Sequence, residues 1–344
     1  NITIHLRGVY ECKISLMPMS GARVYKSILE VQGVKNGETT NLTVPKDNLP
    51  GEFVLRFDYK EKLSSTPYPV EKNILIYNQN LELWVNPIYN KDPDSIWFQK
   101  GEKENTAFFE FSKENAAKKE KIGLLQNFLM NYDDTESNFY QLGIKEYEQR
   151  RQIYNQWLIS QKNEYKALFV SSLFMFQYIP QIDWKGNEAD RIKNLINCYF
   201  DGMDFNDPLV IKTSNINKWM DNYINLYGQL STSIQLRDSL FPLAGKTAIE
   251  MAKKGNPLVY GWMVDYFYKG YESNAIDAGM KILEPYINDT NCLTTKRLEI
   301  TRRLTGMQTL IPGSKAPNIS MTDTNGTPFE LNACFPKNKY ILII

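Results

Sequence analysis

Residues 312–331 read PGSKAPNISMTDTNGTPFEL, and this stretch decides how the rest of the chain is interpreted. Apolar and polar residues alternate on both sides of Asn325-Gly326, a pair that favours a tight hairpin turn because both central residues of a type I′ turn need a positive φ. The stretch therefore predicts two short strands, over residues 316–321 and 327–331, joined by a turn at residues 323–326. The apolar run at residues 340–344 is typical of a buried strand in an α/β sheet.

Upstream of this hairpin, residues 101–310 have the apolar spacing of helices, with polar residues on the opposite faces. Because no repeat of fixed period is present, we expect an irregular helical bundle and not a solenoid. Pro242 lies inside one expected helix and should kink or divide it. The expected helices cover residues 144–176, as one long helix or two, and residues 189–199, 215–226, 231–254, 257–271 and 294–304.

Within this region the helical spacing also selects candidate core residues. In the first segment they are Ala107, Phe108, Phe111, Leu124, Leu125, Phe128 and Leu129; in the second they are Tyr147, Ile153, Tyr154, Trp157, Leu158, Tyr165 and Leu168. A dense aromatic set follows, consisting of Tyr260, Trp262, Tyr266, Phe267, Tyr268 and Tyr271. These aromatic residues either pack in the core or line a groove for a sugar or a peptide, and their pattern leaves both interpretations open.

Residues 1–100 have the two-residue period of β-structure, clearest at residues 2–6, 53–57 and 81–85. Turn signals at residues 35–37, 48–51 and 65–67 separate these runs, and their spacing predicts antiparallel strands in a small sandwich. The fold class is therefore multidomain α+β. It comprises a sandwich-like domain at residues 1–100, a helical domain at residues 101–310, and the first strands of an α/β domain at residues 311–344.

The composition of the chain argues against several classes of function. The 344 residues carry 40 Lys and Arg against 39 Asp and Glu, a net charge of +1, so no overall field favours nucleic acid. No apolar run reaches the roughly 20 residues of a membrane span. His5 is the single histidine, and the cysteines Cys12, Cys198, Cys292 and Cys334 form no CxxC, so we assign no catalytic, cofactor-binding or metal-binding residue. Buried free thiols are expected for these cysteines, with a long-range disulfide as the alternative.

The hairpin stretch, followed by the apolar run, resembles the opening of TlpA/ResA-like, AhpC/TSA-like thioredoxin-fold domains: Gly, two residues, Ala-Pro, a strand, Asp, Gly, and Leu before a central strand. Residues 205–213 (FNDPLVIKT) and 256–266 (NPLVYGWMVDY) resemble the helical module of unknown function that precedes this domain in many Gram-negative envelope proteins. The β-rich start is similar to the small domain that opens those proteins. In that family a CxxC follows the apolar strand, which here would place it beyond Ile344, and Cys334 precedes that strand.

The resemblance implies the accessory, substrate-positioning region of an exported thiol–disulfide oxidoreductase, without the catalytic dithiol. The implied partners are protein disulfide substrates, a dithiol donor and a second copy in a homodimer, with no nucleic acid and no cofactor. The implied location is the periplasm or cell envelope, with a membrane reached only through a removed signal or a lipid anchor; the absence of an initiator Met fits a processed chain. An envelope binding protein for a peptide or glycan, with a degenerate thioredoxin-like tail, is the alternative. Packing of residues 313–344 on the helices would indicate a domain junction.

Overall fold

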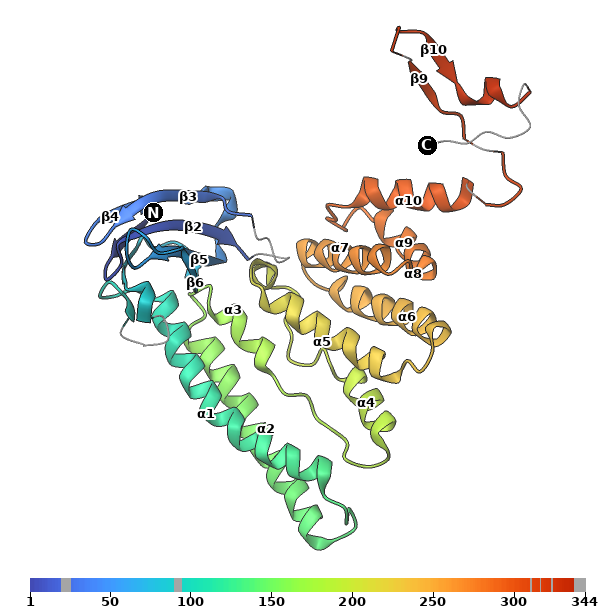
Figure 1. Cartoon of the computed structure of the whole chain (residues 1–344). Coiled ribbons are helices and arrows are strands. Elements are labelled where there is room, and N and C mark those ends of the chain that lie inside the picture. Colours follow the sequence, from blue (N-terminus) through green and yellow to red (C-terminus); the bar gives the residue numbers. More distant parts are fainter. Residues whose placement is uncertain (20–25, 90–94, 310, 316, 323, 337–344) are drawn as a thin grey trace.

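The chain is α+β, as expected, with a β-rich start, a helical middle and β-structure near its C-terminal end (Figure 1). The computed structural model describes residues 1–19, 26–89, 95–309, 311–315, 317–322 and 324–336. The expected strand at residues 340–344 lies outside these ranges. In the described part the strands are β1 (Ile2–Leu6), β2 (Glu11–Pro18), β3 (Leu29–Lys35), β4 (Thr39–Leu42), β5 (Gly51–Lys60), β6 (Tyr68–Ile76), β7 (Leu81–Val85), β8 (Ile96–Phe98), β9 (Ser320–Thr322) and β10 (Pro328–Glu330).

The first eight strands form two four-stranded sheets, with strand orders β4-β1-β7-β8 and β3-β2-β5-β6. Side chains alternate between a buried and an outer face along β1 and β7, which is why residues 2–6 and 81–85 are recognisable in the sequence. The buried faces of both sheets supply one hydrophobic core, including Ile4, Leu83, Ile14 and Phe57. The expected sandwich is therefore present.

One strand pair departs from the expected antiparallel arrangement. β1 and β7 run parallel, with Ile2 opposite Leu81 and Leu6 opposite Val85, whereas the other pairs of the two sheets are antiparallel. The prediction of antiparallel strands throughout residues 1–100 is wrong here because the chain forms the whole second sheet between β1 and β7. It then returns to lie beside its first strand, and neither strand sequence records that direction.

The helical middle contains two hydrophobic cores. One is built by α1, α2 and α3, and the other by the helices from α5 onward. Short 3-10 turns lie at Lys46–Asn48, Pro87–Tyr89, Met175–Gln177, Pro208–Lys212 (η5) and Leu331–Cys334 (η6). The helices are α1 (Glu104–Asn131), α2 (Asn138–Glu164), α3 (Ser171–Phe174), α4 (Glu188–Asn197), α5 (Asn215–Leu230), α6 (Ile234–Ala252), α7 (Pro257–Ser273), α8 (Asp277–Ile282), α9 (Glu284–Ile287) and α10 (Arg297–Thr309).

The expected helix over residues 144–176 has different limits in the structure. α2 begins earlier, where the Ser137 hydroxyl accepts from the backbone N–H of Tyr140, and it ends at Glu164. The chain turns there because the buried carboxylate of Glu104, at the start of α1, accepts the backbone N–H groups of Phe169 and Val170 at 3.0 and 2.8 Å. A contact across more than 60 positions cannot be read from local spacing. Pro242 does not divide α6, which continues from Ile234 to Ala252.

Two expected core positions are also wrong. Leu124 on α1 is 67% exposed and Ile153 on α2 is 55% exposed. α1 and α2 pack as a long hairpin (Figure 1). Its contact seam is narrow, so an apolar residue beside the seam stays in solvent. Ala107, Phe111, Leu129, Tyr147, Tyr154 and Leu158 are buried as expected.

The sandwich is joined to the helical region by buried polar contacts. Asn105 of α1 satisfies both backbone groups of Leu75 on the edge strand β6, accepting its N–H at 2.8 Å and donating to its carbonyl at 2.9 Å. The carboxylate of Glu52 on β5 accepts the backbone N–H and the hydroxyl of Ser214, each at 2.8 Å. The first pair of bonds ties β6 to α1, and the second pair ties β5 to the residue that precedes α5.

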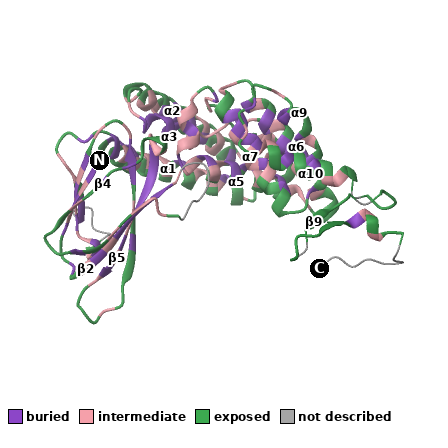
Figure 2. Ribbon diagram, turned by 90° about the horizontal axis from the view of Figure 1, so that it is seen from above, coloured by how far each residue is buried: buried purple, intermediate pink, exposed green. Residues whose placement is uncertain are grey.

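Near the C-terminal end, β9 and β10 pair antiparallel, with Met321 opposite Phe329. The expected hairpin is present, although β9 begins later than the expected strand. Gly326 has a φ of 80°, but Asn325 is not among the described residues with a positive φ, so the expectation of a type I′ turn is wrong. Both strands are exposed throughout and lie clear of the helices, beyond α10 (Figures 1 and 2). These described residues therefore do not show the packing on the helices that would indicate a domain junction.

Candidate functional site

A pocket of about 670 Å³ lies among α5, α6 and α7 and the segment before α10. Pockets that bind small ligands have volumes of roughly 300–1,000 Å³ and combine apolar walls with a few polar groups. This pocket has that character. Its principal lining residues are Asn217, Asp221, Ile224, Phe241, Trp262, Asp265, Tyr266, Phe267, Lys269, Gly270, Tyr271 and Thr295.

α7 positions most of the pocket. The helix begins at Pro257, after the Asn256 side chain accepts the backbone N–H of Leu258 at 2.9 Å. Pro is favoured in the first turn because its fixed φ suits a helix and its missing N–H is not needed there. The helix then runs without interruption to Ser273, so that residues 262, 265, 266, 269 and 270 recur on the side that faces the pocket.

Asp265 holds the segment before α10 against α7. Its carboxylate accepts the hydroxyl of Thr294, and it also accepts the backbone N–H and hydroxyl of Thr295 at 3.1 and 2.6 Å. Both carboxylate oxygens are therefore engaged within the protein. Asp265 builds the pocket wall and is already satisfied before any ligand arrives.

Trp262 and Tyr266 form an aromatic pair at the pocket. Their ring centroids are 5.5 Å apart and the rings are inclined by 22°, which is a stacked arrangement. The Tyr266 hydroxyl donates to Asp221 on α5 at 2.7 Å. Burial, followed by this hydrogen bond to a carboxylate, raises the pKa of Tyr266 above its ordinary value, so the hydroxyl remains a donor at physiological pH.

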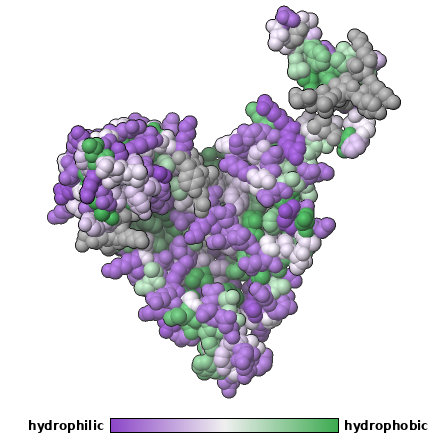
Figure 3. All heavy atoms as spheres, in the orientation of Figure 1, coloured by the Kyte–Doolittle hydropathy of each residue, from purple (hydrophilic) through white to green (hydrophobic). Residues whose placement is uncertain are grey.

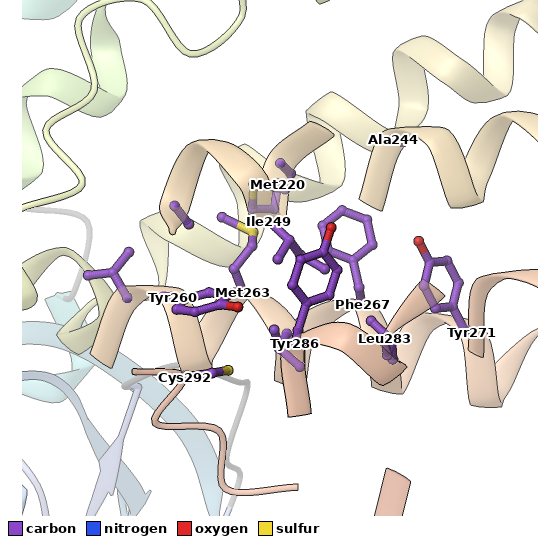
Figure 4. Close-up of a cluster of buried hydrophobic side chains, with 14 of the residues drawn as sticks. Met220, Ala244, Ile249, Tyr260, Met263, Phe267, Tyr271, Leu283, Tyr286 and Cys292 are labelled. Atoms are coloured by element: carbon purple, nitrogen blue, oxygen red, sulfur yellow. The ribbon is translucent and has the colours of Figure 1, made fainter. Parts of the chain in front are cut away.

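The apolar side of the pocket is continuous with the helical core. Phe267 and Tyr271 are buried, with ring centroids 5.7 Å apart, and point toward α6 in the close-up of this core (Figure 4). The Tyr271 hydroxyl donates to the carbonyl of Phe241 at 3.0 Å. Because core packing fixes these two side chains, the pocket is formed without a ligand.

The aromatic set is divided between the core and the pocket. Trp262, Tyr266, Phe267 and Tyr271 line the pocket, whereas Tyr260 is buried and donates weakly to Asp289 at 3.4 Å. The sequence did not single out Asn217, Asp221 or Phe241. These residues lie on other helices, and no motif links them to α7.

Two of the four cysteines, Cys12 and Cys292, are buried and are not poised for disulfide exchange. Cys12, Cys198 and Cys292 are free thiols; Cys12 and Cys292 are buried, as expected, but Cys198 is half-buried. Cys334 is also half-buried, and its Sγ donates to the carbonyl of Glu330 at 3.9 Å. Burial raises the pKa of Cys12 to about 12 and that of Cys292 to about 11. Since the thiolate is the reactive form, these two groups are inert near neutral pH.

This burial predicts how the thiols respond to an alkylating reagent. We expect Cys12 and Cys292 of the folded protein to stay unmodified by iodoacetamide at pH 8, because burial keeps both thiols protonated and shields them from the reagent. Both should react fully in urea. Mass spectrometry of peptides after a timed reaction measures this, and rapid modification of either cysteine in the folded chain would show that its burial is wrong.

His5 lies on β1, as expected for a residue in a strand, and its ring bonds to Thr39 and Glu82, each at 2.8 Å. The described residues hold no cluster of three or more His, Cys, Asp or Glu side chains arranged for a metal. None of the helices in the described part of the chain combines the length and apolar character that crossing a bilayer requires. No family model, curated protein or solved structure matches the chain.

Proposed function

We propose that this chain is the substrate-positioning region of an exported thiol–disulfide oxidoreductase of the thioredoxin-like family. In this proposal the sandwich and the helices hold a protein substrate, and the C-terminal hairpin opens the domain that carries the reactive dithiol beyond Ile344. The chain's own cysteines contribute no catalytic group.

The C-terminal hairpin is the observation that carries this proposal. Two paired strands lie within the stretch that resembles the opening of a thioredoxin-like domain, which supports the proposal. Ile319, Met321 and Phe329 are exposed on this hairpin, Met321 to 54%, and a hydrophobic patch is visible there in Figure 3. A two-stranded hairpin is marginally stable alone, and exposed apolar side chains on it are expected where further strands complete a sheet.

The pocket supports the positioning role. An exchange reaction needs a substrate disulfide to be held near the attacking thiolate, and binding a neighbouring part of the substrate raises its effective concentration. The preformed pocket lies in the helical region immediately upstream of the hairpin, separated from it in sequence by α10. It is therefore suited to hold a substrate segment while the reaction takes place elsewhere.

The test begins with the codons that follow Ile344. We expect them to encode Cys-x-x-Cys within about 20 residues, at the start of a helix, where the N-terminal dipole lowers the pKa of the first cysteine. The longer protein should reduce a peptide disulfide with a dithiol donor, and replacing the first Cys of the pair by Ser should abolish turnover. If no cysteine pair is encoded, the redox proposal fails.

The pocket favours a second candidate function, an envelope binding protein for a peptide or a glycan with a degenerate thioredoxin-like tail. Its aromatic pair and apolar side would serve a binding protein equally well. This second function is favoured if the downstream cysteine pair is missing and the pocket still binds a ligand.

A further inference from the structure

We propose that the pocket binds a basic side chain, Arg or Lys, from an extended segment of the protein substrate. This inference rests on the proposed function in that it identifies the part of the substrate the helical region holds. Two features of the pocket carry it: an accessible carboxylate and a stacked aromatic pair beside that carboxylate.

Asp221 is the accessible carboxylate. It is exposed, its one hydrogen bond among the described residues is the 2.7 Å bond from Tyr266, and it has no ion pair there. The other charged groups at the pocket are Asp265 and Lys269, so the carboxylates outnumber the cations by two to one. A ligand that brings a positive charge is therefore favoured over a neutral or an acidic ligand.

The aromatic pair strengthens this preference. Trp262 and Tyr266 are half-buried, and Tyr266 connects the stacked pair directly to Asp221. A guanidinium or ammonium group is attracted to the face of an aromatic ring, most strongly to Trp, and the planar Arg group can stack on the ring while donating to a carboxylate. One side chain can thus contact the ring surface and Asp221 together, with its aliphatic stem against the apolar side of the pocket.

Several of the hydrogen-bonding groups at the pocket are already engaged within the protein. A glycan presents many hydroxyls and needs several free donors and acceptors around it, whereas both oxygens of Asp265 are engaged by Thr294 and Thr295. The Tyr271 hydroxyl is likewise committed to the Phe241 carbonyl. The side-chain nitrogen of Asn217 is an exception, since it is buried without a partner among the described residues. A single cationic group needs little more than the carboxylate and the rings.

Gly270 provides a direct way to block the pocket. It lies inside α7 at the pocket, and an added Cβ would meet no atom within 4 Å. A Gly270→Leu substitution therefore places a side chain in open space while improving the helix propensity of the position. Gly123 in α1 is the matched control because its added Cβ also meets no atom within 4 Å and it does not line the pocket.

The experiment measures binding of three end-blocked pentapeptides to the whole chain by calorimetry. Their sequence is Gly-Gly-Xaa-Gly-Gly, where Xaa is arginine, citrulline or glutamate; citrulline keeps the shape of arginine without its charge. We expect the arginine peptide to bind about tenfold more tightly than the citrulline peptide, and the glutamate peptide to bind least. A neutral oligosaccharide serves as the glycan probe, for which we expect no binding.

Variants locate the binding. Gly270→Leu should abolish binding of the arginine peptide without lowering the melting temperature, and Gly123→Leu should leave binding unchanged. Asp221→Asn, which keeps an acceptor for Tyr266, should weaken binding about fivefold. The same substitution at Asp133, which lies in the exposed loop between α1 and α2, should have no effect.

Several results would overturn the inference. These are equal affinity for arginine and citrulline peptides, no binding of the arginine peptide, binding unaffected by Gly270→Leu, or binding of the oligosaccharide that Gly270→Leu removes. None of these results bears on whether a cysteine pair follows Ile344, so the redox proposal can stand when the inference fails. Conversely, arginine-selective binding without a cysteine pair would keep the pocket assignment and remove the redox role.

Discussion

Replacing Glu104 by Ala is expected to destabilise the protein by about 4 kcal/mol, because it leaves two buried backbone N–H groups without an acceptor. The carboxylate accepts Phe169 N–H at 3.0 Å and Val170 N–H at 2.8 Å, and the side chain is 2% exposed. Gln should be milder than Ala, since its amide oxygen can serve one N–H while its NH₂ group faces the other. Urea unfolding of the three proteins measures these differences.

The cost of Glu104→Ala should also depend on pH. Burial, the largest influence, raises the pKa of Glu104 above its ordinary value, so the folded protein binds this proton more tightly than the unfolded chain does. The contribution of the carboxyl to stability is therefore greatest at low pH and declines as pH rises through the raised pKa. We expect a larger difference between wild type and Glu104→Ala at pH 5 than at pH 8.

The matched control is Glu110→Ala, on the same helix but exposed to solvent. It should change the free energy of unfolding little at either pH. An equal effect of the two substitutions would mean that Glu104 does not hold the turn that ends α2.

Replacing Gly261 by Ala is expected to destabilise the protein by about 3 kcal/mol through overpacking. An added Cβ would lie 2.2 Å from the carbonyl carbon of Leu293 and 2.6 Å from the backbone nitrogen of Thr294. These are backbone atoms that cannot rotate away, so the segment before α10 must move off α7. That segment carries Thr295 into the pocket wall, and the arginine peptide should bind more weakly as well.

Gly270→Ala supplies the opposite result on the same helix. Its added methyl group meets no atom within 4 Å, and Ala is favoured over Gly in a helix interior by about 1 kcal/mol. We therefore expect the melting temperature to rise for Gly270→Ala and to fall for Gly261→Ala. A loss of stability at both positions would contradict the close approach assigned to Gly261.

The sequence predicted the helices and strands of this fold better than it predicted which of them pair or pack together. The limits of β1 and β7 match the expected runs because alternation over a half-buried strand is a local signal. The parallel pairing of these two strands is not local, because it depends on where the chain returns after the second sheet. The end of α2 was missed for the same reason, since Glu104 fixes it from another helix.

The candidate site was likewise predicted only where its residues lie close together in the sequence. Its α7 residues stood out as a dense aromatic set, because Trp262, Tyr266 and Tyr271 recur on a single helix. The carboxylate that gives the pocket its charge preference, Asp221, lies 45 positions from its hydrogen-bond partner Tyr266. Nothing in its own neighbourhood distinguishes it from other surface acids, so only the packing of α5 against α7 reveals it.

The most direct test of the account is the Michaelis constant of the longer protein, carrying the residues after Ile344, for a disulfide peptide with an arginine beside its cysteine. We predict dithiol-dependent reduction, with a KM that rises several-fold in Gly270→Leu and stays at the wild-type value in Gly123→Leu. Reduction with the same KM in all three proteins would contradict the positioning role, and no reduction by any of them would contradict the redox assignment.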